Sequence, residues 1–184
     1  EFNRGRAESQ VASAILTTYP FDAELAARIA ALPGVAAAEG RATTSVRVLT
    51  APDTWRSLNI TVVDEFDRMQ VDKYLPVAGV WPTQKGEIML EWLGLDYLGA
   101  AIGDTLTIEL TNGARKQLQV VGTGHDPQQL SPEIINVTGG IVTPETMTYL
   151  GLSHLFTDLH LRVDAAHADP AGVAAVVDAV EERI

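Results

Sequence analysis

Alternation of apolar and polar residues predicts strands in several parts of the chain. The segments 58–62, 104–110 and 157–164 alternate most clearly, and in the first of them Leu58, Ile60 and Val62 face one way. Successive side chains of a strand point to opposite faces, so each segment is expected to bury one face. Less regular runs, rich in β-branched residues or partly alternating, predict further strands at 11–18, 35–50, 87–90, 117–123 and 140–143.

Two amphipathic helices are predicted, one near each end of the chain. The first follows Asp22, a residue suited to the N-cap, and stops at Pro33-Gly34, with an apolar stripe made of Leu25, Ile29 and Leu32. The second follows Asp169, and its apolar positions recur at i, i+3, i+4 and i+7: Val173, Val176, Val177 and Val180. Short helices are predicted at 92–98 and 144–150.

The two ends therefore repeat one pattern of strand, cap and helix. We expect an α+β fold in which 11–50 and 151–184 form one discontinuous lobe with a βαβ repeat, and 51–150 forms an inserted, β-rich lobe. The first strand of each copy is expected in the centre of a sheet and the second strand at an edge, with both helices on one face. We expect the second copy to lack the strand that would follow Ile184. In the inserted lobe Asn112-Gly113 predicts a hairpin, and 64–76 and 124–138 are expected to be irregular.

Composition narrows the classes of function. The 184 residues hold 13 Lys and Arg against 24 Asp and Glu, a net charge of −11, which disfavours binding to nucleic acid or to an anionic membrane surface. The absence of cysteine excludes a thiol nucleophile, a thiolate metal site and a disulfide. No apolar run is long enough to cross a bilayer and no signal peptide opens the chain. We expect Glu1 to Ile184 to be a piece of a longer protein, with Glu1-Phe2 not necessarily native.

Catalytic and nucleotide motifs are weak. The histidines, His125, His154, His160 and His167, do not pair at the spacing of a helical metal site, and we interpret them as solvated or locally satisfied. His125 and Asp126 lie close to Ser131 in sequence, but adjacent residues of one loop rarely align as base and orienter. A nucleotide loop at Gly122-Thr123-Gly124 lacks its third glycine, where Pro127 stands. No catalytic, cofactor-binding or metal-binding residue is predicted.

Three other groups of residues have two interpretations each. The acidic cluster of Asp64, Glu65, Asp67 and Asp72 is interpreted as a solvated connector rather than a calcium loop, because it lacks the central glycine and the terminal glutamate. Asn59 and Asn136 match the short glycosylation pattern, which also arises by chance. For the tryptophans we favour packing in a core or between lobes over a recognition surface: Trp55, Trp81 and Trp92.

Several ordered motifs resemble a known family. They are Ile29-Ala-Ala-Leu32-Pro33-Gly34-Val35, then Gly79-x-Trp81-Pro82-x-x-x-Gly86-Glu87-Ile88-x-Leu90, then Leu98-Gly99 followed by Ile102-Gly103-Asp104-x-Leu106-x-Ile108, and finally Leu118-Gln119-Val120-Val121-Gly122. Their order and spacing resemble the extracytoplasmic core domain of MacB/FtsX/LolC-type ABC transporter permeases, over residues 11–184.

The resemblance implies a porter-like βαβ lobe that carries an inserted small α/β lobe, placed between two transmembrane helices of a bacterial membrane protein. It implies a domain that is not an enzyme and binds no cofactor, in a permease that works as a dimer. A separate cytoplasmic ATPase would drive it by mechanotransmission to move a substrate or partner outside the membrane. Roles in the family include lipoprotein extraction, efflux of peptides or antibiotics and control of cell-wall hydrolases, and no hook-like loop for lipoproteins is recognisable here.

Two alternatives stay open at this point. One is a stand-alone extracellular binding or sensor module that uses a cleft between lobes. The other is a hydrolase that uses His125 and Asp126, or the acidic cluster between Asp64 and Asp72.

Overall fold

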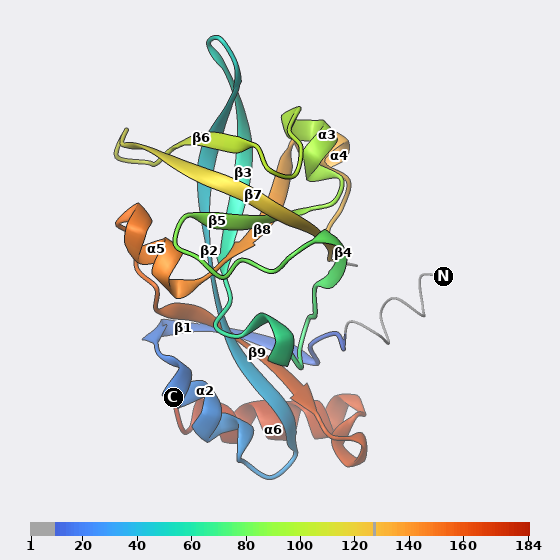
Figure 1. The fold of residues 1–184 in the computed structure, drawn as a ribbon. Helices are drawn as coiled ribbons and strands as arrows, with labels where there is room; N and C mark the ends of the chain where they lie inside the picture. The colour runs from blue at the N-terminus through green and yellow to red at the C-terminus, as the bar shows by residue number, and fades with distance from the viewer. Residues whose placement is uncertain (1–9, 127) are drawn as a thin grey trace. The chain divides into compact units, whose positions relative to one another are not determined.

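A computed structural model describes residues 10–126 and 128–184 (Figure 1). These residues form two compact units. Unit 1 contains the described residues up to Ala42 together with Asp64–Lys73 and Leu155–Ile184, and unit 2 contains Thr43–Val63 and Tyr74–His154. The polar start of the chain at 1–6 and Pro127 lie outside the described residues. The predicted α+β class is confirmed, because the described chain combines helices with strands that pair mostly antiparallel.

Unit 1 is built on an antiparallel sheet in the order β1–β9–β2. Its elements are β1 (Ala14–Phe21), α2 (Ala23–Ala30), the first part of β2 (Val35–Ala51), the 3-10 helix η1 (Phe66–Arg68), β9 (Phe156–Val163), the 3-10 helix η2 (Ala165–His167) and α6 (Pro170–Glu181). The central place predicted for the first strand of each copy is confirmed for β9. It is wrong for β1, which lies at the edge because no described strand pairs with its outer side.

The helices of unit 1 begin where their caps predict. The Asp22 carboxylate accepts a hydrogen bond from the backbone N–H of Leu25 at 3.1 Å, and the Asp169 carboxylate accepts one from that of Gly172 at 2.8 Å. Figure 1 shows α2 and α6 on the same side of the sheet, as predicted. The buried side chains of the helices and of β9 form the core of this unit: Ile29, Val176, Val180, Leu159, Leu161 and Val163.

A polar network holds residues 64–73 in unit 1. Asp72 accepts a hydrogen bond from the backbone N–H of Ala12 at 2.9 Å, and its other oxygen lies 2.5 Å from Nδ1 of His160 on β9. Glu39 on β2 accepts from the backbone N–H of Gln70 at 2.5 Å and pairs with Arg41 at 2.6 Å. The interpretation of a solvated connector therefore fails at Asp72, whose side chain is only 10% exposed.

Unit 2 is a ring of hydrogen-bonded strands in the order β2–β3–β8–β5–β7–β6, which closes because β6 also pairs with β2. The contacts β3–β8 and β5–β7 are parallel. The elements that follow β2 are β3 (Thr54–Val62), β4 (Leu75–Gly79), β5 (Glu87–Glu91), α3 (Gly94–Leu98), β6 (Thr105–Glu109), β7 (Arg115–His125), α4 (Pro132–Ile135), β8 (Val137–Val142) and α5 (Pro144–Leu150).

Alternate residues of the ring strands are fully buried and form the core of unit 2, among them Val48, Leu58, Ile60, Ile88, Leu90, Ile108, Leu118 and Ile141. The hairpin predicted at Asn112-Gly113 joins β6 to β7, and Gly113 there has a φ of +81°. No helix in the described ranges combines the length and the apolar character that a bilayer span requires.

Candidate functional site

Two parallel strands of unit 2 end side by side and bring together a carboxylate and an imidazole. In the register of β5 and β7, Glu91 is opposite Gly124, so His125 follows immediately at the same end of the ring. The backbone N–H of Trp92 donates to the carbonyl of Gly124 at 2.9 Å and holds the two strand ends together. Loop residues after β7 therefore start beside a buried acid.

The Glu91 carboxylate is the centre of this arrangement. Its side chain is 2% exposed, and one oxygen accepts a hydrogen bond from the backbone N–H of Asp126 at 2.9 Å. The other oxygen lies 3.2 Å from Nδ1 of His125. The indole Nε1–H of Trp92 donates to the same Nδ1 at 3.1 Å, with the two rings edge to face and their centroids 6.0 Å apart.

These contacts allow two positions of the imidazole hydrogen. When Nδ1 carries no hydrogen, its single lone pair can accept from the Trp92 indole. When Nδ1 carries a hydrogen, it can donate to the Glu91 carboxylate, and the indole loses its acceptor. Burial raises the pKa of Glu91, against the lowering effects of the Asp126 backbone hydrogen bond and of His125.

The raised pKa predicts a pH dependence for the variant Glu91→Gln. Between the ordinary carboxyl pKa and the raised one, the folded chain holds a proton that the unfolded chain has lost, so the free energy of unfolding falls as pH rises. A glutamine at this position has no carboxyl proton, so the variant does not show this fall in stability. Its side-chain oxygen can still accept the hydrogen bond from the backbone N–H of Asp126. At about pH 8 we expect the free energy of unfolding of the variant to equal that of the native chain or to exceed it by about 1 kcal/mol. This advantage is expected to disappear towards about pH 5.

Urea unfolding at both pH values measures this difference. Glu145→Gln, at an exposed position, is the matched control and is expected to show no such pH-dependent difference. A loss of stability in Glu91→Gln that is equal at both pH values would mean that Glu91 acts only as a hydrogen-bond acceptor.

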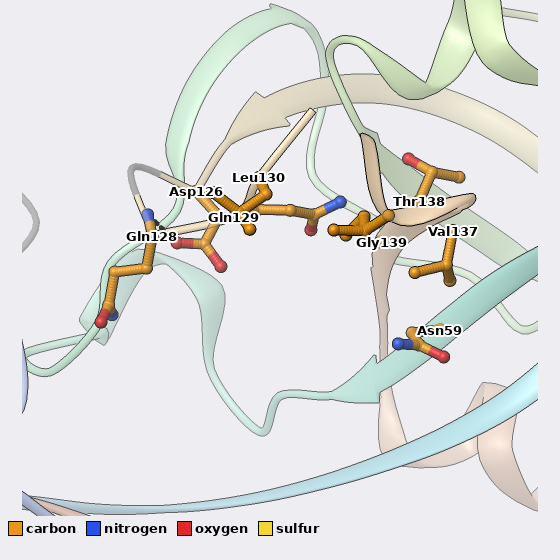
Figure 2. Close-up of a pocket in the computed structure, with 9 residues that line it drawn as sticks. Asn59, Asp126, Gln128, Gln129, Leu130, Val137, Thr138 and Gly139 are labelled. Carbon is orange, nitrogen blue, oxygen red and sulfur yellow. Dashed lines mark hydrogen bonds between the residues drawn. The ribbon is translucent and has the colours of Figure 1, made fainter. Parts of the chain in front are cut away.

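A pocket of about 320 Å³ lies beside this cluster, within unit 2. Figure 2 shows Gln129 reaching towards Gly139, where a Cβ atom would come within 2.3 Å of the Gln129 side-chain oxygen. Asp126 shapes the loop that lines the pocket, because it accepts from the backbone N–H groups of Gln128 at 2.9 Å and Gln129 at 3.0 Å. The remaining lining comes from Leu130, Ile135 and the strand residues Asn59, Val137 and Thr138.

The side chains that line this pocket can bind a polar ligand by hydrogen bonds. Amide groups of Asn59, Gln128 and Gln129 offer both donors and acceptors, and Asp126 adds a carboxylate. Thr138 is 1% exposed, and its hydroxyl oxygen has no hydrogen-bond partner among the described residues. Glu91 is too deeply buried to pass its proton to a ligand in the pocket.

The candidate catalytic residues of the sequence do not meet as a triad. His125 contacts Glu91, the Asp126 side chain accepts from Gln128, and the Ser131 hydroxyl donates to Glu133 at 2.7 Å. The pairing of Glu91 with His125 was not predictable from local sequence, because 34 positions separate them. The signal available was a glutamate that directly follows the apolar run Ile88-Met89-Leu90.

The other candidate residues are dispersed. His160 pairs with Asp72, His167 lies 2.7 Å from Asp164, and His154 is exposed. Asp64, Glu65 and Asp67 are exposed. In the ranges that the structure describes, no group of His, Asp and Glu side chains has the arrangement of a metal site.

The asparagines and tryptophans differ in their surroundings. Asn59 lies within β3 and accepts from the Ser45 hydroxyl at 2.6 Å, and the Asn136 carbonyl accepts from the Tyr97 hydroxyl at 2.7 Å. The prediction that the tryptophans pack in a core is wrong for full burial, because Trp55 and Trp81 are only half-buried and Trp92 is 46% exposed. Packing between lobes stays a prediction.

Comparison with known proteins identifies the fold. No protein-family model and no curated protein sequence matches the chain. Among solved structures it is similar to the periplasmic region of MacB from Actinobacillus actinomycetemcomitans, with a TM-score of 0.57 and 9% identity over 91% of this chain and 81% of that one. It is also similar to the extracellular domain of the noncanonical ABC-type transporter YknZ from Gram-positive bacteria, with a TM-score of 0.58 and 9% identity over 91% and 93%. The fold that the sequence motifs predict is confirmed.

Proposed function

We propose that this chain is the extracytoplasmic domain of an ABC-type transporter permease. In this role it is not an enzyme. It couples ATP hydrolysis by a separate cytoplasmic ATPase, through the membrane helices of the parent protein, to the movement of a substrate or partner outside the membrane. The observation that carries the proposal is a similarity that extends over 91% of this chain to domains of two such transporters.

The proposal includes an assignment of the two lobes and of the assembly. The termini, 11–50 and 151–184, act as the porter-like lobe and 51–150 as the inserted lobe, and the full-length permease works as a dimer. The compact units have slightly different bounds, since 64–73 belong to unit 1, and 43–50 and 151–154 belong to unit 2. The four ordered motifs between Ile29 and Gly122 support this assignment independently of the fold. Two compact units in one domain suit a part that transmits motion by a change between discrete arrangements.

Labelling of a single cysteine tests the location. The domain has no cysteine, and Tyr19 on β1 is 90% exposed. In the full-length parent protein, Tyr19→Cys is expected to react with a membrane-impermeant maleimide added to intact cells or spheroplasts, and to be protected in inverted vesicles until detergent is added. The readout is the mass shift of the labelled protein in the membrane fraction.

Two controls make this test decisive. Ala26→Cys, whose native side chain is 6% exposed, is expected to react only after unfolding, and the unsubstituted parent reports any cysteine outside this domain. Labelling from the cytoplasmic side alone would overturn the proposal. Recovery of the protein outside the membrane fraction would instead favour the second candidate, a stand-alone ligand-binding module, which the polar pocket at Gln129 and Asn59 supports.

A parent protein whose cysteines outside this domain have been replaced tests the coupling. Spin labels at Tyr19→Cys in unit 1 and Thr111→Cys in unit 2, carried by one protomer of each permease, report the distribution of distances between the two labelled positions. We expect this distribution to shift between the nucleotide-free and the ATP-trapped transporter. An unchanged distribution in a transporter that hydrolyses ATP would contradict a mechanical role for the two units.

A further inference from the structure

Three strands of unit 2 place one glutamate between two arginines. Arg47 on β2 is the register partner of Glu109 on β6, and Glu109 is in turn the partner of Arg115 on β7. Arg47 forms an ion pair with one carboxylate oxygen, and Nε of Arg115 lies 3.3 Å from the other. The glutamate side chain is only 14% exposed, whereas the arginine side chains are 59% and 60% exposed.

The indole ring of Trp55 supports both guanidinium groups. The central carbon of Arg47 lies 5.1 Å from the ring centroid, and that of Arg115 lies 5.2 Å from it. A guanidinium that stacks on an aromatic face keeps its N–H groups free to bind in its own plane. Towards the described residues, Arg47 uses one terminal nitrogen and Arg115 only Nε, so several donors of each remain available.

The cluster is positively charged in a unit whose net charge is negative. Unit 2 contains five Lys and Arg against nine Asp and Glu, a net charge of 5 − 9 = −4. The cluster of Arg47, Arg115 and Glu109 has a net charge of +1. It keeps this charge at neutral pH, because the arginine hydrogen bonds lower the pKa of Glu109.

A groove of about 530 Å³ lies beside this cluster, also within unit 2. Its lining includes Arg47 and Glu109 of the cluster and the buried residues Val46 and Leu110. Hydroxyl groups of Ser45, Ser57 and Thr111 line the same groove. It therefore combines exposed cationic donors, small apolar surfaces and hydrogen-bonding groups, which are the contacts that a short extended peptide needs.

We propose that this groove binds an acidic peptide segment of a partner protein, with a partner carboxylate held by Arg47 and Arg115. A guanidinium can hold a carboxylate by two parallel N–H···O bonds, and the Trp55 ring orients both guanidinium groups. A long polyanion such as nucleic acid, or an anionic membrane, would also meet the surrounding negative charge of the chain. A short segment can place its carboxylate at the arginine pair without extending over this negative surface. The proposal goes beyond the transporter role and does not depend on it.

Titration of a defined peptide tests the proposal on the present chain. The probe is acetyl-Glu-Leu-Glu-Leu-Glu-amide, and the control probe is the same peptide with glutamine in place of glutamate. We expect the acidic peptide to shift the NMR signals of the Trp55 indole N–H and of the Arg47 and Arg115 Nε–H groups. Its affinity is expected to fall several-fold when salt rises from about 20 mM to about 300 mM, since these charges are exposed.

Substitutions identify the groups that bind. Arg47→Gln and Arg115→Gln are each expected to weaken binding about tenfold or more, and Arg47→Lys, which keeps the charge but not the planar fork, to weaken it less. The matched control is Arg56→Gln, which removes a cation stacked 4.6 Å above Tyr97 in the same unit and is expected to leave affinity unchanged. Absence of binding, equal binding of the glutamine peptide, or full affinity in both arginine variants would each overturn the proposal.

Discussion

Leu159→Ala is expected to lower the free energy of unfolding of unit 1 by about 3 kcal/mol, the usual range for a leucine removed from a close-packed core. Leu159 is fully buried in β9, the central strand of the three-stranded sheet. Its register partners are Leu16 on β1 and Gly40 on β2. Gly40 has no side chain that could move into the space, so we expect a cavity to remain on that side.

Chemical denaturation, followed by circular dichroism, measures this loss. Ile15→Ala is the matched control, because Ile15 lies on the adjacent edge strand but is 53% exposed. We expect it to change stability by less than about 0.5 kcal/mol. Equal losses in the two variants would contradict the assignment of the unit 1 core to the face that carries Leu159.

Gly40→Ala is expected to destabilise the same sheet by about 2–3 kcal/mol through overpacking. A Cβ atom at this position would lie 2.2 Å from Cδ2 of Phe156 and 2.8 Å from its Cβ. Phe156 has little room to withdraw, since it is 4% exposed and packs on Phe21 with ring centroids 5.8 Å apart. The close approach of β2 to β9 therefore depends on the absence of a side chain.

A double-mutant cycle measures the clash directly. Phe156→Leu alone is expected to cost about 1 kcal/mol, and in combination with Gly40→Ala it is expected to recover part of the loss from the glycine substitution. The coupling energy from denaturation of the four proteins is the readout. Additive losses would show that the ring of Phe156 does not constrain Gly40.

Local chemistry accounts for the parts of the fold that the sequence predicts. Asp22 and Asp169 satisfy free N–H groups at helix starts, so they mark those starts wherever the helices pack. Alternation in β3, β6 and β9 reflects one buried face, as at Leu58, Leu106 and Leu159. Both signals, the helix caps and the alternation, depend only on residues close together in the sequence. The folded structure keeps the elements that they predict.

The elements that the sequence does not predict lack such signals. β4 (Leu75–Gly79) is exposed at all residues except a half-buried Leu75, and it contains Pro76 and Gly79, so neither alternation nor propensity marks it. It forms because β7 offers it hydrogen bonds. α4 (Pro132–Ile135) is a single turn within the segment expected to be a loop, and it is too short for an apolar period.

The candidate sites depend on strand pairing over long sequence separations. Glu91 meets His125 because β5 and β7 are parallel, and parallel pairing was not among the expectations for these strands. Arg47 and Glu109 meet across 62 positions because β6 closes the ring onto β2. Composition indicated an acidic surface and could not indicate where its few cations gather, which is decided by register.

Closure of the six-stranded ring also bears on aggregation of the native protein. Of the described strands in unit 2, only β4 lies outside the ring, so an intruding strand from another molecule finds a template of five residues there. Pro76 has no N–H group to donate to such a strand. Fibril growth from the ring strands therefore requires the ring to open first, and the rate of that growth should follow the population of opened molecules.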